Sequence, residues 1–522
     1  MLRLENHRYA KVPAGTTVNN TNAVPVQNDE LGLDPRTPAE WREARELGHR
    51  MVDDMFEFLE NVRERGAWQA VPNSVKQRLN EPVPVDAQSL ESIYDQFREN
   101  ILPFPTGNIH PRFWGWVMGT GTVPGMLAQL LEGAMNAHVA GYDQAAAVVE
   151  RQVLLWLADL VGFRASASGI LVSGGTMANL IGLAVGRNTK AGFDIRREGL
   201  QGDSPRLCVY GSTETHSWAT RGCELLGLGR SALKLIPVDG DYRIDIGALR
   251  AAIERDLSHG NKPICVIGNA GTVNTGAIDD LEAIGAVCRE FDLWYHIDGA
   301  FGAMAALAPR LRDKVEGMTE ADSLAFDLHK WGYVQYEAGV VLVRDAVAHR
   351  ASFAMSPAYL QPALGGISVD PLYFADLGVQ LSREFRALKI WMSLKAQGAR
   401  QWGDLIQQNF DQAQHLARLV TESRDLQLLA PAPLNVVCFR YVGGSSVGVD
   451  LDELNAAIVV AVQERGIAVP SSTYIGPGER RSFAIRVAIT NHRTRREDID
   501  VFVSEVRSIG RELAARSTRR PA

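Results

Sequence analysis

The chain lacks a cysteine framework and lacks any apolar run of membrane-spanning length. Its five cysteines are scattered through 522 residues without a Cys-x-x-Cys pair, which argues against a disulfide scaffold and against a zinc site. The N-terminal segment has no apolar core of the kind found in signal peptides, and no stretch approaches the roughly 20 apolar residues that cross a bilayer. We therefore expect a cytoplasmic protein without a membrane partner or a bound metal.

The chain also lacks an excess of basic residues. Its 54 lysines and arginines are outnumbered by 61 aspartates and glutamates, and the net charge of −7 argues against a nucleic-acid partner. Arginines gather only near the C-terminus, where a solvated helix face accounts for them (Arg507, Arg511, Arg516, Arg519, Arg520). A length of 522 residues predicts two or three domains rather than one.

The N-terminal region predicts an arm followed by helices. Residues 1 to about 36 are polar and contain glycine, asparagine and proline, which is typical of an extended arm. A helix then begins with Thr37 as its N-cap, Pro38 in the first position and Glu40 completing a capping box. A second helix is expected from Leu90 to about Ile101.

From about Gly169 the sequence alternates short apolar runs, glycine turns and helical stretches. The runs are continuously apolar, which is typical of strands covered on both faces and hence of a mainly parallel α/β sheet (170–172, 207–210, 264–267, 293–297, 340–343). After a long helix predicted over 383–397, two further runs indicate a smaller α+β domain (436–439, 483–489). We therefore predict an N-terminal arm with helices (1–105), a large α/β domain (106–395) and a small C-terminal α+β domain (396–522).

Ser173-Gly174-Gly175-Thr176 follows the first of these strands and precedes a helix. Glycines let backbone N–H groups approach a phosphate, Thr176 adds a hydroxyl, and the helix N-terminus supplies positive potential. The motif therefore predicts a phosphate site. An ordinary strand-to-helix turn is the alternative, and it explains the motif equally well when the motif is taken alone.

Lys330 and Asp298 are the strongest candidates for chemistry. Lys330 follows an apolar run, and burial should lower its pKa and free its amine to attack a carbonyl. Asp298 ends a buried strand, where a carboxylate needs a cationic or hydrogen-bonding partner. A protonated pyridine nitrogen is such a partner, and an arginine of the fold is the alternative. Next to Asp298, Gly299 and Ala300 leave space for a ring.

Three weaker candidates also follow predicted strands. His216 could stack on a flat heterocycle, although a lone histidine is more often structural. Thr272 could hydrogen-bond a cofactor substituent or a substrate carboxylate, whereas Asp279 and Asp280 are predicted to cap the next helix. His329 could contact a phosphate or a substrate carboxylate, and helix-cap packing is its equally weighted alternative.

With these residues in place, the chain resembles the group II pyridoxal-phosphate-dependent decarboxylases over residues 37 to about 505. The most specific matching stretches are His110–Phe113, Ser173–Asn179, Tyr295–Ala300 and Asp322–Trp331. The resemblance implies the fold type I of pyridoxal-phosphate enzymes, with a mainly parallel seven-stranded sheet and helices on both faces. It also implies a homodimer with shared active sites, in which the N-terminal helices pack on the partner subunit.

The resemblance further implies roles for individual residues. Lys330 matches the Schiff-base lysine, Asp298 the partner of the pyridinium nitrogen, and His216 the residue stacked on the cofactor ring. Three positions match the phosphate site (Gly175, Thr176, His329). Tyr359 matches the tyrosine of a mobile loop that protonates the decarboxylated intermediate, and the proline- and glycine-rich composition of 355–370 is typical of such a loop.

The chain departs from the family pattern in two places. The position three before the lysine, often asparagine in animal members, is Asp327, which we expect to face an arginine or a backbone donor. The segment expected to line the substrate pocket reads Trp116-Val117-Met118-Gly119, with His138 further on, rather than the Tyr-Phe-Pro-Thr of the animal aromatic decarboxylases. The departure bears on which substrate is used and leaves the reaction class unchanged.

The resulting prediction is an enzyme that converts an L-amino acid, aromatic or bulky because the pocket segment is apolar, into an amine and carbon dioxide. The alternatives are an aldehyde synthase on the same scaffold, a decarboxylase of acidic or diamino acids, an aminotransferase, and a non-catalytic relative. Arg486 could bind a carboxylate as in aminotransferases, and an ion pair in the small domain is its other interpretation. His216 and Tyr359 together favour plain decarboxylation.

Overall fold

A computed structural model describes residues 32–164, 166–202, 204–355, 366–368, 373–443, 449–476 and 481–517. The described chain divides into two compact units. One comprises residues 32–62 and 72–103, and the other comprises 63–71 and the residues from 104 onward. Each unit is described separately.

The first unit consists of α1 (Pro38–Glu60), α2 (Asn73–Arg78) and α3 (Leu90–Asn100), and the single turn η1 (Val62–Glu64) follows α1. The predicted capping box is confirmed, because Thr37 Oγ1 accepts from Glu40 N while the Glu40 carboxylate accepts from Thr37 N. Helices α1 and α3 are joined where Asp54 accepts a hydrogen bond from Tyr94 at 2.6 Å. The two predicted helices therefore form at the expected positions.

The second unit contains a seven-stranded sheet with the strand order β2-β8-β7-β6-β5-β3-β4. Strands β3 to β7 run parallel to one another, whereas β8 runs antiparallel to its neighbours β2 and β7. The expected mainly parallel, seven-stranded sheet is confirmed. The strands are β2 (Ser168–Val172), β3 (Leu207–Ser212), β4 (Leu233–Ile236), β5 (Lys262–Asn269), β6 (Trp294–Asp298), β7 (Ser323–Asp327) and β8 (Gly339–Val343).

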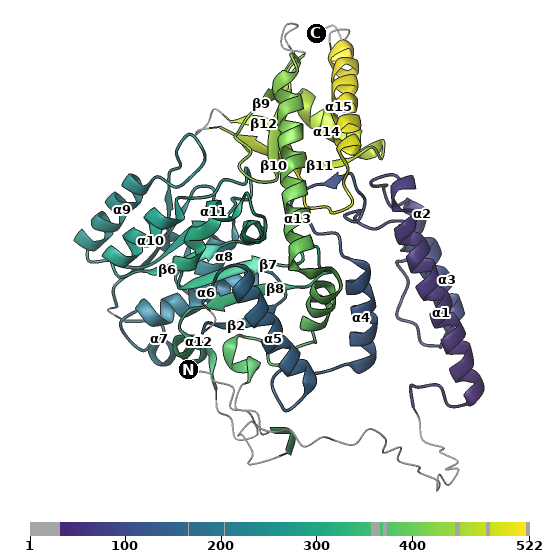
Figure 1. Ribbon diagram of the computed structural model, residues 1–522, viewed down its shortest axis with the longest axis horizontal. Coiled ribbons are helices and arrows are strands. Elements are labelled where there is room, and N and C mark those ends of the chain that lie inside the picture. The colour runs from purple at the N-terminus through teal and green to yellow at the C-terminus, as the bar shows by residue number, and fades with distance from the viewer. Residues whose placement is uncertain are drawn as a thin grey trace. The chain divides into compact units, whose positions relative to one another are not determined.

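Helices cover the sheet, as the continuous apolarity of its strands predicts (Figure 1). Helix α6 (Gly175–Lys190) packs across β5 to β8, and α10 (Leu281–Glu290) packs on β5 and β6. The other helices are α4 (Val123–Met135), α5 (Ala145–Leu160), α7 (Ile195–Glu198), α8 (Trp218–Leu225), α9 (Ile246–Ser258), α11 (Arg312–Val315) and α12 (Ala346–Phe353). Short 3-10 turns are η2 (Arg230–Ala232), η3 (Gly302–Leu307), η4 (Glu316–Glu320), η6 (Gly366–Ser368) and η7 (Phe374–Leu377).

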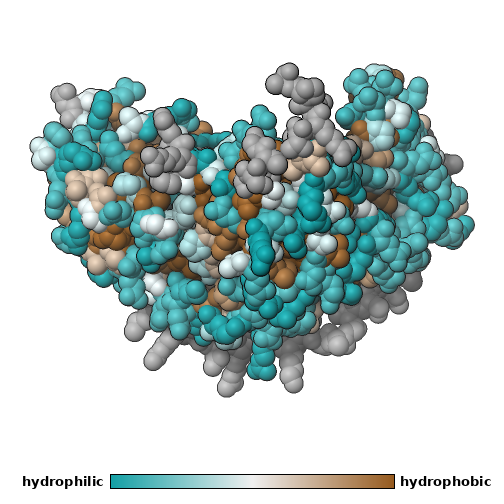
Figure 2. Space-filling model, turned by 90° about the horizontal axis from the view of Figure 1, so that it is seen from above, coloured by the Kyte–Doolittle hydropathy of each residue, from teal (hydrophilic) through white to brown (hydrophobic). Residues whose placement is uncertain are grey.

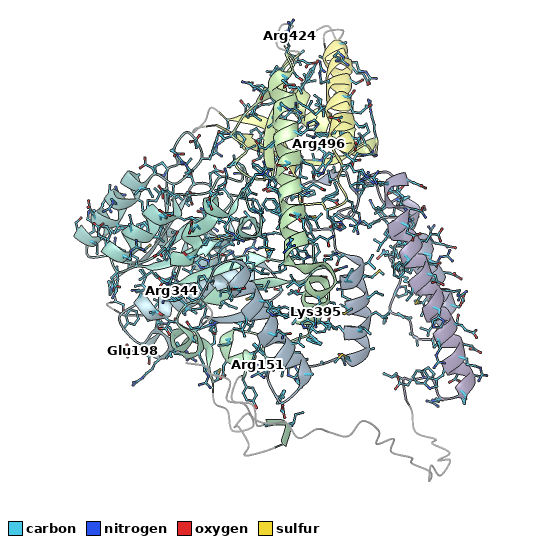
Figure 3. The ribbon with its side chains drawn as sticks, in the orientation of Figure 1. Arg151, Glu198, Arg344, Lys395, Arg424 and Arg496 are labelled. Atoms are coloured by element: carbon cyan, nitrogen blue, oxygen red, sulfur yellow. The ribbon has the colours of Figure 1, made fainter. Side chains whose placement is uncertain are left out.

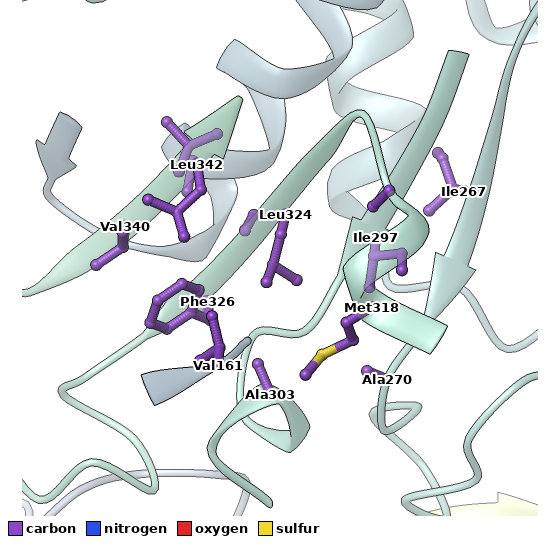
Figure 4. Close-up of a cluster of buried hydrophobic side chains, with 14 of the residues drawn as sticks. Val161, Ile267, Ala270, Ile297, Ala303, Met318, Leu324, Phe326, Val340 and Leu342 are labelled. Carbon is purple, nitrogen blue, oxygen red and sulfur yellow. The ribbon is translucent and has the colours of Figure 1, made fainter. Parts of the chain in front are cut away.

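The core of this sheet is formed by side chains that neighbouring strands place side by side. Figure 4 shows Ile267 of β5, Ile297 of β6, Leu324 and Phe326 of β7, and Val340 and Leu342 of β8, all of them buried. All five cysteines are also buried and unpaired, in agreement with their interpretation as small core residues. The apolar core thus holds the strands rigidly, and their polar ends lie at its border.

A second, five-stranded sheet has the order β1-β11-β12-β10-β9 and is covered by α14 (Leu451–Glu464) and α15 (Arg496–Ser517). Its strands are β1 (Phe113–Trp114), β9 (Leu426–Leu428), β10 (Val436–Tyr441), β11 (Val469–Ile475) and β12 (Ser482–Ala488). Strand β1 comes from far upstream and pairs in parallel with β11. The segment that follows β1, predicted to line the substrate pocket, is therefore tied to the C-terminal sheet.

Helix α13 (Ala387–Glu422) links the two sheets and is longer than the predicted 383–397. Gly398 interrupts it with a φ of 78°, a left-handed conformation that favours glycine. Near this break, Lys395, labelled in Figure 3, places its Nζ 4.3 Å from the centroid of the Trp391 ring. The predicted boundary at 395/396 lies three residues before Gly398 and stays a prediction.

Apolar side chains also reach the surface of the second unit. Figure 2 shows brown apolar patches among the teal polar residues of one face. The exposed apolar residues include members of α4 and α5 (Leu130, Leu131, Met135, Val148, Leu155). Among the helices of the described residues, none has both the length and the apolar character that a bilayer crossing requires.

Candidate active site

The polar residues predicted to carry chemistry lie along one edge of the seven-stranded sheet. Asn269 and Asp298, the last residues of β5 and β6, are register partners, and Asp327 at the end of β7 pairs with Gly339 at the start of β8. Because β2 also ends beside Gly339, the Ser173–Thr176 turn begins at this same edge. In α/β sheets ligands bind outside the carboxyl ends of the strands, so this edge is the candidate site.

The N-terminus of α6 has no side-chain cap. Gly174 occupies the N-cap position, and no side chain accepts a hydrogen bond from the first turn there. A Cβ on Gly174 would lie 3.1 Å from His329 Cε1, and a Cβ on Gly175 would lie 2.7 Å from Asp327 Oδ2. The glycines therefore let the turn and the 327–330 segment approach closely. The uncapped N–H groups, with the Thr176 hydroxyl, suit a phosphate.

Asp298 is buried at the end of β6, with 6% of its surface exposed. Its Oδ2 accepts from Trp218 Nε1 at 2.6 Å and its Oδ1 accepts from Ala300 N at 3.0 Å. No arginine within the described ranges forms an ion pair with it, so the alternative interpretation as a structural Arg–Asp pair is wrong. The carboxylate is fixed by two donors and keeps lone pairs for a further cationic partner.

Lys330 forms an ion pair with Asp327, its Nζ lying 2.9 Å from Oδ2. The Asp327 side chain is 1% exposed and that of Lys330 is 25% exposed. Burial lowers the pKa of Lys330, but the Asp327 carboxylate and, more weakly, Asp298 outweigh it and raise the pKa above its usual value. The expectation of a lowered pKa is therefore wrong, and so is the expectation that Asp327 faces an arginine or a backbone donor.

His329 packs at the start of α6, in agreement with the alternative weighed for it, and its contact with a phosphate or substrate carboxylate stays a prediction. Its Nδ1 accepts from Ala338 N at 3.0 Å, which anchors the turn before β8, and its ring lies against Gly174 at the α6 N-terminus. Burial lowers the pKa of His329 to about 4, so the ring is neutral near pH 7. A neutral Nε2 beside the helix N-terminus can donate one hydrogen bond to an anion there.

His216 lies after β3, with an exposed ring. Its Nδ1 accepts from Trp218 N at 3.1 Å, and Trp218 in turn donates to Asp298. Partial burial lowers the pKa of His216, while Asp298 opposes this shift. The same turn therefore orients the histidine and the aspartate, and an exposed flat ring beside Asp298 is available for stacking.

Thr272, in contrast, is buried and engaged within its own loop. Its Oγ1 accepts from Ala277 N at 3.1 Å and lies 3.1 Å from Thr275 Oγ1. The cofactor contact expected of Thr272 is untested, and its hydroxyl already has partners. In the same loop Asp280 caps α10 as predicted, but Asp279 does not, because it is buried and accepts from Ile244 N, Asn269 N and Asn269 Nδ2.

The predicted pocket segment runs directly against the lysine. A Cβ on Gly119 would lie 2.1 Å from His329 O and 2.7 Å from Lys330 O, so the backbones are in contact there. Val117 and Met118 are half-buried, and Trp116 is exposed with a φ of 52°. His138 lies elsewhere, with Arg383 N 3.4 Å from its Nδ1, and no contact among the described residues joins it to Trp116–Gly119.

Arg486 forms no ion pair within the described residues, so the predicted ion pair in the small domain is wrong, and its binding of a substrate carboxylate stays a prediction. It is buried, and its guanidinium donates to the backbone carbonyls of Trp116, Val273 and Asn274. Burial lowers its pKa. The arginine therefore fastens the pocket segment to the loop after β5, since its donors bind carbonyls of both.

Tyr336 was missed in the sequence. Its ring lies 4.5 Å from that of His329, and its carbonyl accepts from Lys389 Nζ and Gln129 Nε2, each at 3.2 Å. Burial raises the pKa of the Tyr336 hydroxyl, while Lys330 and a hydrogen bond from the Gly119 backbone lower it, so the hydroxyl lies between these two segments. In the sequence, the one indication of Tyr336 was its position six residues after Lys330. Tyr359 and most of the predicted mobile loop lie outside the described residues.

Comparisons with known proteins agree with this site. Residues 72–442 match the family model described as the pyridoxal-dependent decarboxylase conserved domain. An aromatic-L-amino-acid decarboxylase of Bacillus atrophaeus is 30% identical over 476 residues, covering 90% of this chain and 96% of the relative. A histidine decarboxylase of Drosophila melanogaster is 30% identical over 488 residues, covering 90% of this chain and 55% of the relative.

Among solved structures, that of Oryza sativa TDC with PLP and tryptamine superposes with a TM-score of 0.84. It is 23% identical and covers 92% of this chain and 100% of that chain. At this identity the likeness concerns the fold, and it agrees with the expected fold type I.

Proposed function

Because the chain belongs to the pyridoxal-dependent decarboxylase family, we propose that it removes the α-carboxylate of an aromatic or other bulky L-amino acid. The broader activity, decarboxylation of an amino acid with pyridoxal phosphate as cofactor, follows from the family itself. The observation that carries the proposal is the meeting of Lys330, Asp298 and the uncapped N-terminus of α6 at one sheet edge.

The residues at this edge fit pyridoxal phosphate. The first-turn N–H groups of α6, the Thr176 hydroxyl and the neutral His329 suit its phosphate, and the amine of Lys330 suits its aldehyde. When bound, the cofactor supplies an electron sink for the pair released from the broken bond. Asp298, already fixed by Trp218 and Ala300, would keep the ring nitrogen protonated and sustain that sink.

The remaining roles belong to Lys330, His216 and Tyr359. Lys330 would hold the cofactor through its amine, and His216 would cover one face of the cofactor ring. Tyr359 donates the proton to the α-carbon after the carboxylate leaves, a form of general-acid help typically worth about 10²–10⁴ in rate. Tyr359→Phe should therefore slow amine formation by that factor with unchanged cofactor binding, measured by amine release and cofactor absorbance.

The substrate class rests on the pocket segment and on the relatives. Val117 and Met118 precede Gly119, whose backbone contacts that of Lys330, and would give the substrate pocket an apolar wall; the Bacillus relative is named for aromatic substrates. An acidic or diamino acid would leave its charge unpaired against such a wall. The comparison to make is kcat/KM over the common L-amino acids, with amine products identified by mass; preference for an acidic or basic side chain would contradict the proposal.

A homodimer is part of the proposal. The exposed apolar side chains of α4 and α5, among them Leu131 and Met135, suit burial against a second copy of the chain. Sedimentation should give twice the monomer mass, and Leu131→Glu should shift it toward the monomer. A monomeric, fully active wild type would exclude active sites shared between subunits.

The decisive experiment identifies the lysine. Borohydride reduction of the cofactor-loaded enzyme, followed by peptide mass analysis, should place the cofactor on Lys330, and Lys330→Ala should remove the visible absorbance band. Lys389 is a matched comparison, because it is also buried and its pKa is lowered by burial, the property first expected of Lys330. Label on Lys389 would overturn the assignment. Release of ammonia and peroxide in place of amine would indicate an aldehyde synthase.

A further inference from the structure

Asp327 is a buried carboxylate with almost no conventional partners. It is 1% exposed, and neither oxygen accepts a hydrogen bond within the described chain; its one close polar contact is Lys330 Nζ at 2.9 Å. His329 Nε2, the next charged or polar group, lies 3.8 Å from Oδ2. A buried carboxylate normally gathers several donors, so this one depends on the lysine charge.

The Asp327 carboxylate lies beside the first turn of α6. Its Oδ2 lies 2.7 Å from where a Cβ of Gly175 would be, and its Oδ1 lies 3.8 Å from the corresponding point on Gly174. Both glycines belong to the first, uncapped turn of the 16-residue helix α6. The carboxylate therefore shares the positive N-terminus that the phosphate of the cofactor requires.

Four further titratable groups face this ion pair. His216, Asp298 and His329 come from the ends of β3, β6 and β7, and Tyr336 comes from the turn before β8. Burial lowers the pKa of both histidines, to about 4 for His329, so they stay neutral above pH 7. The Tyr336 hydroxyl stays protonated there, because burial raises its pKa.

We infer that Asp327 is a built-in counter-ion that restrains cofactor loading, by keeping the free Lys330 amine charged and by placing a negative charge beside the N-terminus of α6. A charged amine cannot attack an aldehyde, so Lys330 must lose its proton to solvent before it bonds the cofactor. The phosphate must then bind next to the negative charge of the Asp327 carboxylate. Asp327 acts through Lys330 and is a positioning residue. The inference rests on the proposed role of Lys330.

The test compares loading of wild type and Asp327→Asn by stopped-flow absorbance, starting from protein stripped of cofactor. Because a charged neighbour typically shifts a pKa by about 1–3 units, Asp327→Asn should load at least about tenfold faster at pH 7.5. The wild-type rate should rise about tenfold per pH unit up to pH 9.5, because the neutral fraction of an amine does so below its pKa. The advantage of the variant should shrink as the pH rises.

Pyridoxal without the phosphate separates the two parts of the inference. Asp327→Asn lowers the pKa of Lys330, which should accelerate loading of both compounds. Removal of the negative charge beside α6 should accelerate loading of pyridoxal phosphate alone. The gain should therefore be larger for the phosphorylated compound. An equal increase in loading rate for the two compounds would rule out an effect of the Asp327 charge at α6. A variant that loads no faster than wild type would overturn the counter-ion role.

Asp322→Asn is the matched control, since Asp322 lies just before the opposite end of β7 and accepts from Tyr295 N at 2.8 Å. Its loading should equal that of wild type. If Asp327→Asn fails to fold, the wild-type protein still tests whether Lys330 is charged. An amine reagent modifies the lysine and peptide mass analysis measures the rate, which should keep rising through pH 9. A plateau below pH 8 would overturn the inference. A loaded band retained in Lys330→Ala would instead refute the lysine assignment.

Discussion

Two buried ion pairs of the second unit differ in what surrounds them. Arg383 and Glu150 are both fully buried, and Arg383 also donates to the carbonyls of Val139 (2.6 Å) and Leu171 (2.8 Å). Its guanidinium lies 5.0 Å from the centroid of the Phe374 ring. Lys330 and Asp327 have no such supporting donors and acceptors, and Lys330 reaches solvent.

We call Arg383–Glu150 the permanent pair, because its partners are fixed, and Lys330–Asp327 the exchangeable pair, because its lysine can change partners. Breaking a fully buried pair leaves an unsolvated charge, so every further hydrogen bond to Arg383 makes the pair harder to replace. Lys330 can be solvated as soon as its partner changes, because it is partly exposed. The first pair therefore fastens the sheet to the 136–144 segment, and the second leaves its lysine available for chemistry.

Removing one member of the permanent pair should have the largest effect on folding. Arg383→Met should lower the free energy of unfolding by about 3–5 kcal/mol, because Glu150 stays buried without its partner. Denaturant unfolding measures this. Arg250→Met, at the exposed pair with Glu290, should leave the free energy of unfolding nearly unchanged. If the two variants were equally stable, the distinction between buried and exposed pairs would be lost.

Acid should weaken the surroundings of the permanent pair. His349 is buried and bonds Ser168 Oγ and the carbonyl of Leu377, in the same short helix η7 as Phe374, and burial lowers its pKa to about 4. The unfolded chain binds the proton more tightly, so stability present at pH 7 is lost as the pH falls from about 6.5 toward 4, up to about 3 kcal/mol. Unfolding at pH 7 and pH 5 measures the loss, which His349→Gln should reduce.

Removing the Asp327 carboxylate from the exchangeable pair should change stability little. Asp327→Asn should change the free energy of unfolding of the cofactor-free protein by about 1 kcal/mol or less, because Lys330 remains partly solvated. The measurement is the same denaturant titration that is applied to Arg383→Met. A loss as large as that of Arg383→Met would show that both pairs are structural.

The smallest effect is expected at Tyr336, whose hydroxyl lies between Lys330 and Gly119. Tyr336→Phe should lower kcat/KM by about 2- to 10-fold, the value of one neutral hydrogen bond, with no loss of stability. Tyr333→Phe is the control three residues earlier, since its buried hydroxyl donates to Asn409 Oδ1 at 2.8 Å and should matter for folding only. If Tyr336→Phe lowered stability and Tyr333→Phe lowered kcat/KM, Tyr336 would lie outside the site.

The strands and the site edge could be predicted because each depends on local sequence. Continuous apolar runs predicted strands of the large sheet, although β4 was missed, and Lys330, Asp298 and the Ser173–Thr176 turn stand where such runs end. Thr37 and Glu40 likewise signalled the start of α1 through contacts three residues apart.

The partners of charged side chains could not be predicted, because they come from distant segments. Arg486 turns out to bind carbonyls of Trp116 and Val273, far apart in sequence from it and from each other. Asp279 joins the end of β5 to Ile244, in the segment before α9, instead of capping a helix. Lys330 and Asp327 are only three residues apart, but whether the carboxylate or burial governs the pKa of the lysine depends on three-dimensional packing.

Gly119 has a consequence for protein engineering. A pocket segment is an attractive cassette for transplanting specificity from one decarboxylase to another. Here any side chain at 119 would collide with the carbonyl oxygens of His329 and Lys330, so a donor segment ending in a larger residue would push the lysine backbone out of place. Grafts should therefore vary 116–118 and keep the glycine, because the peptide predicted to line the substrate pocket also contacts the backbone of the lysine.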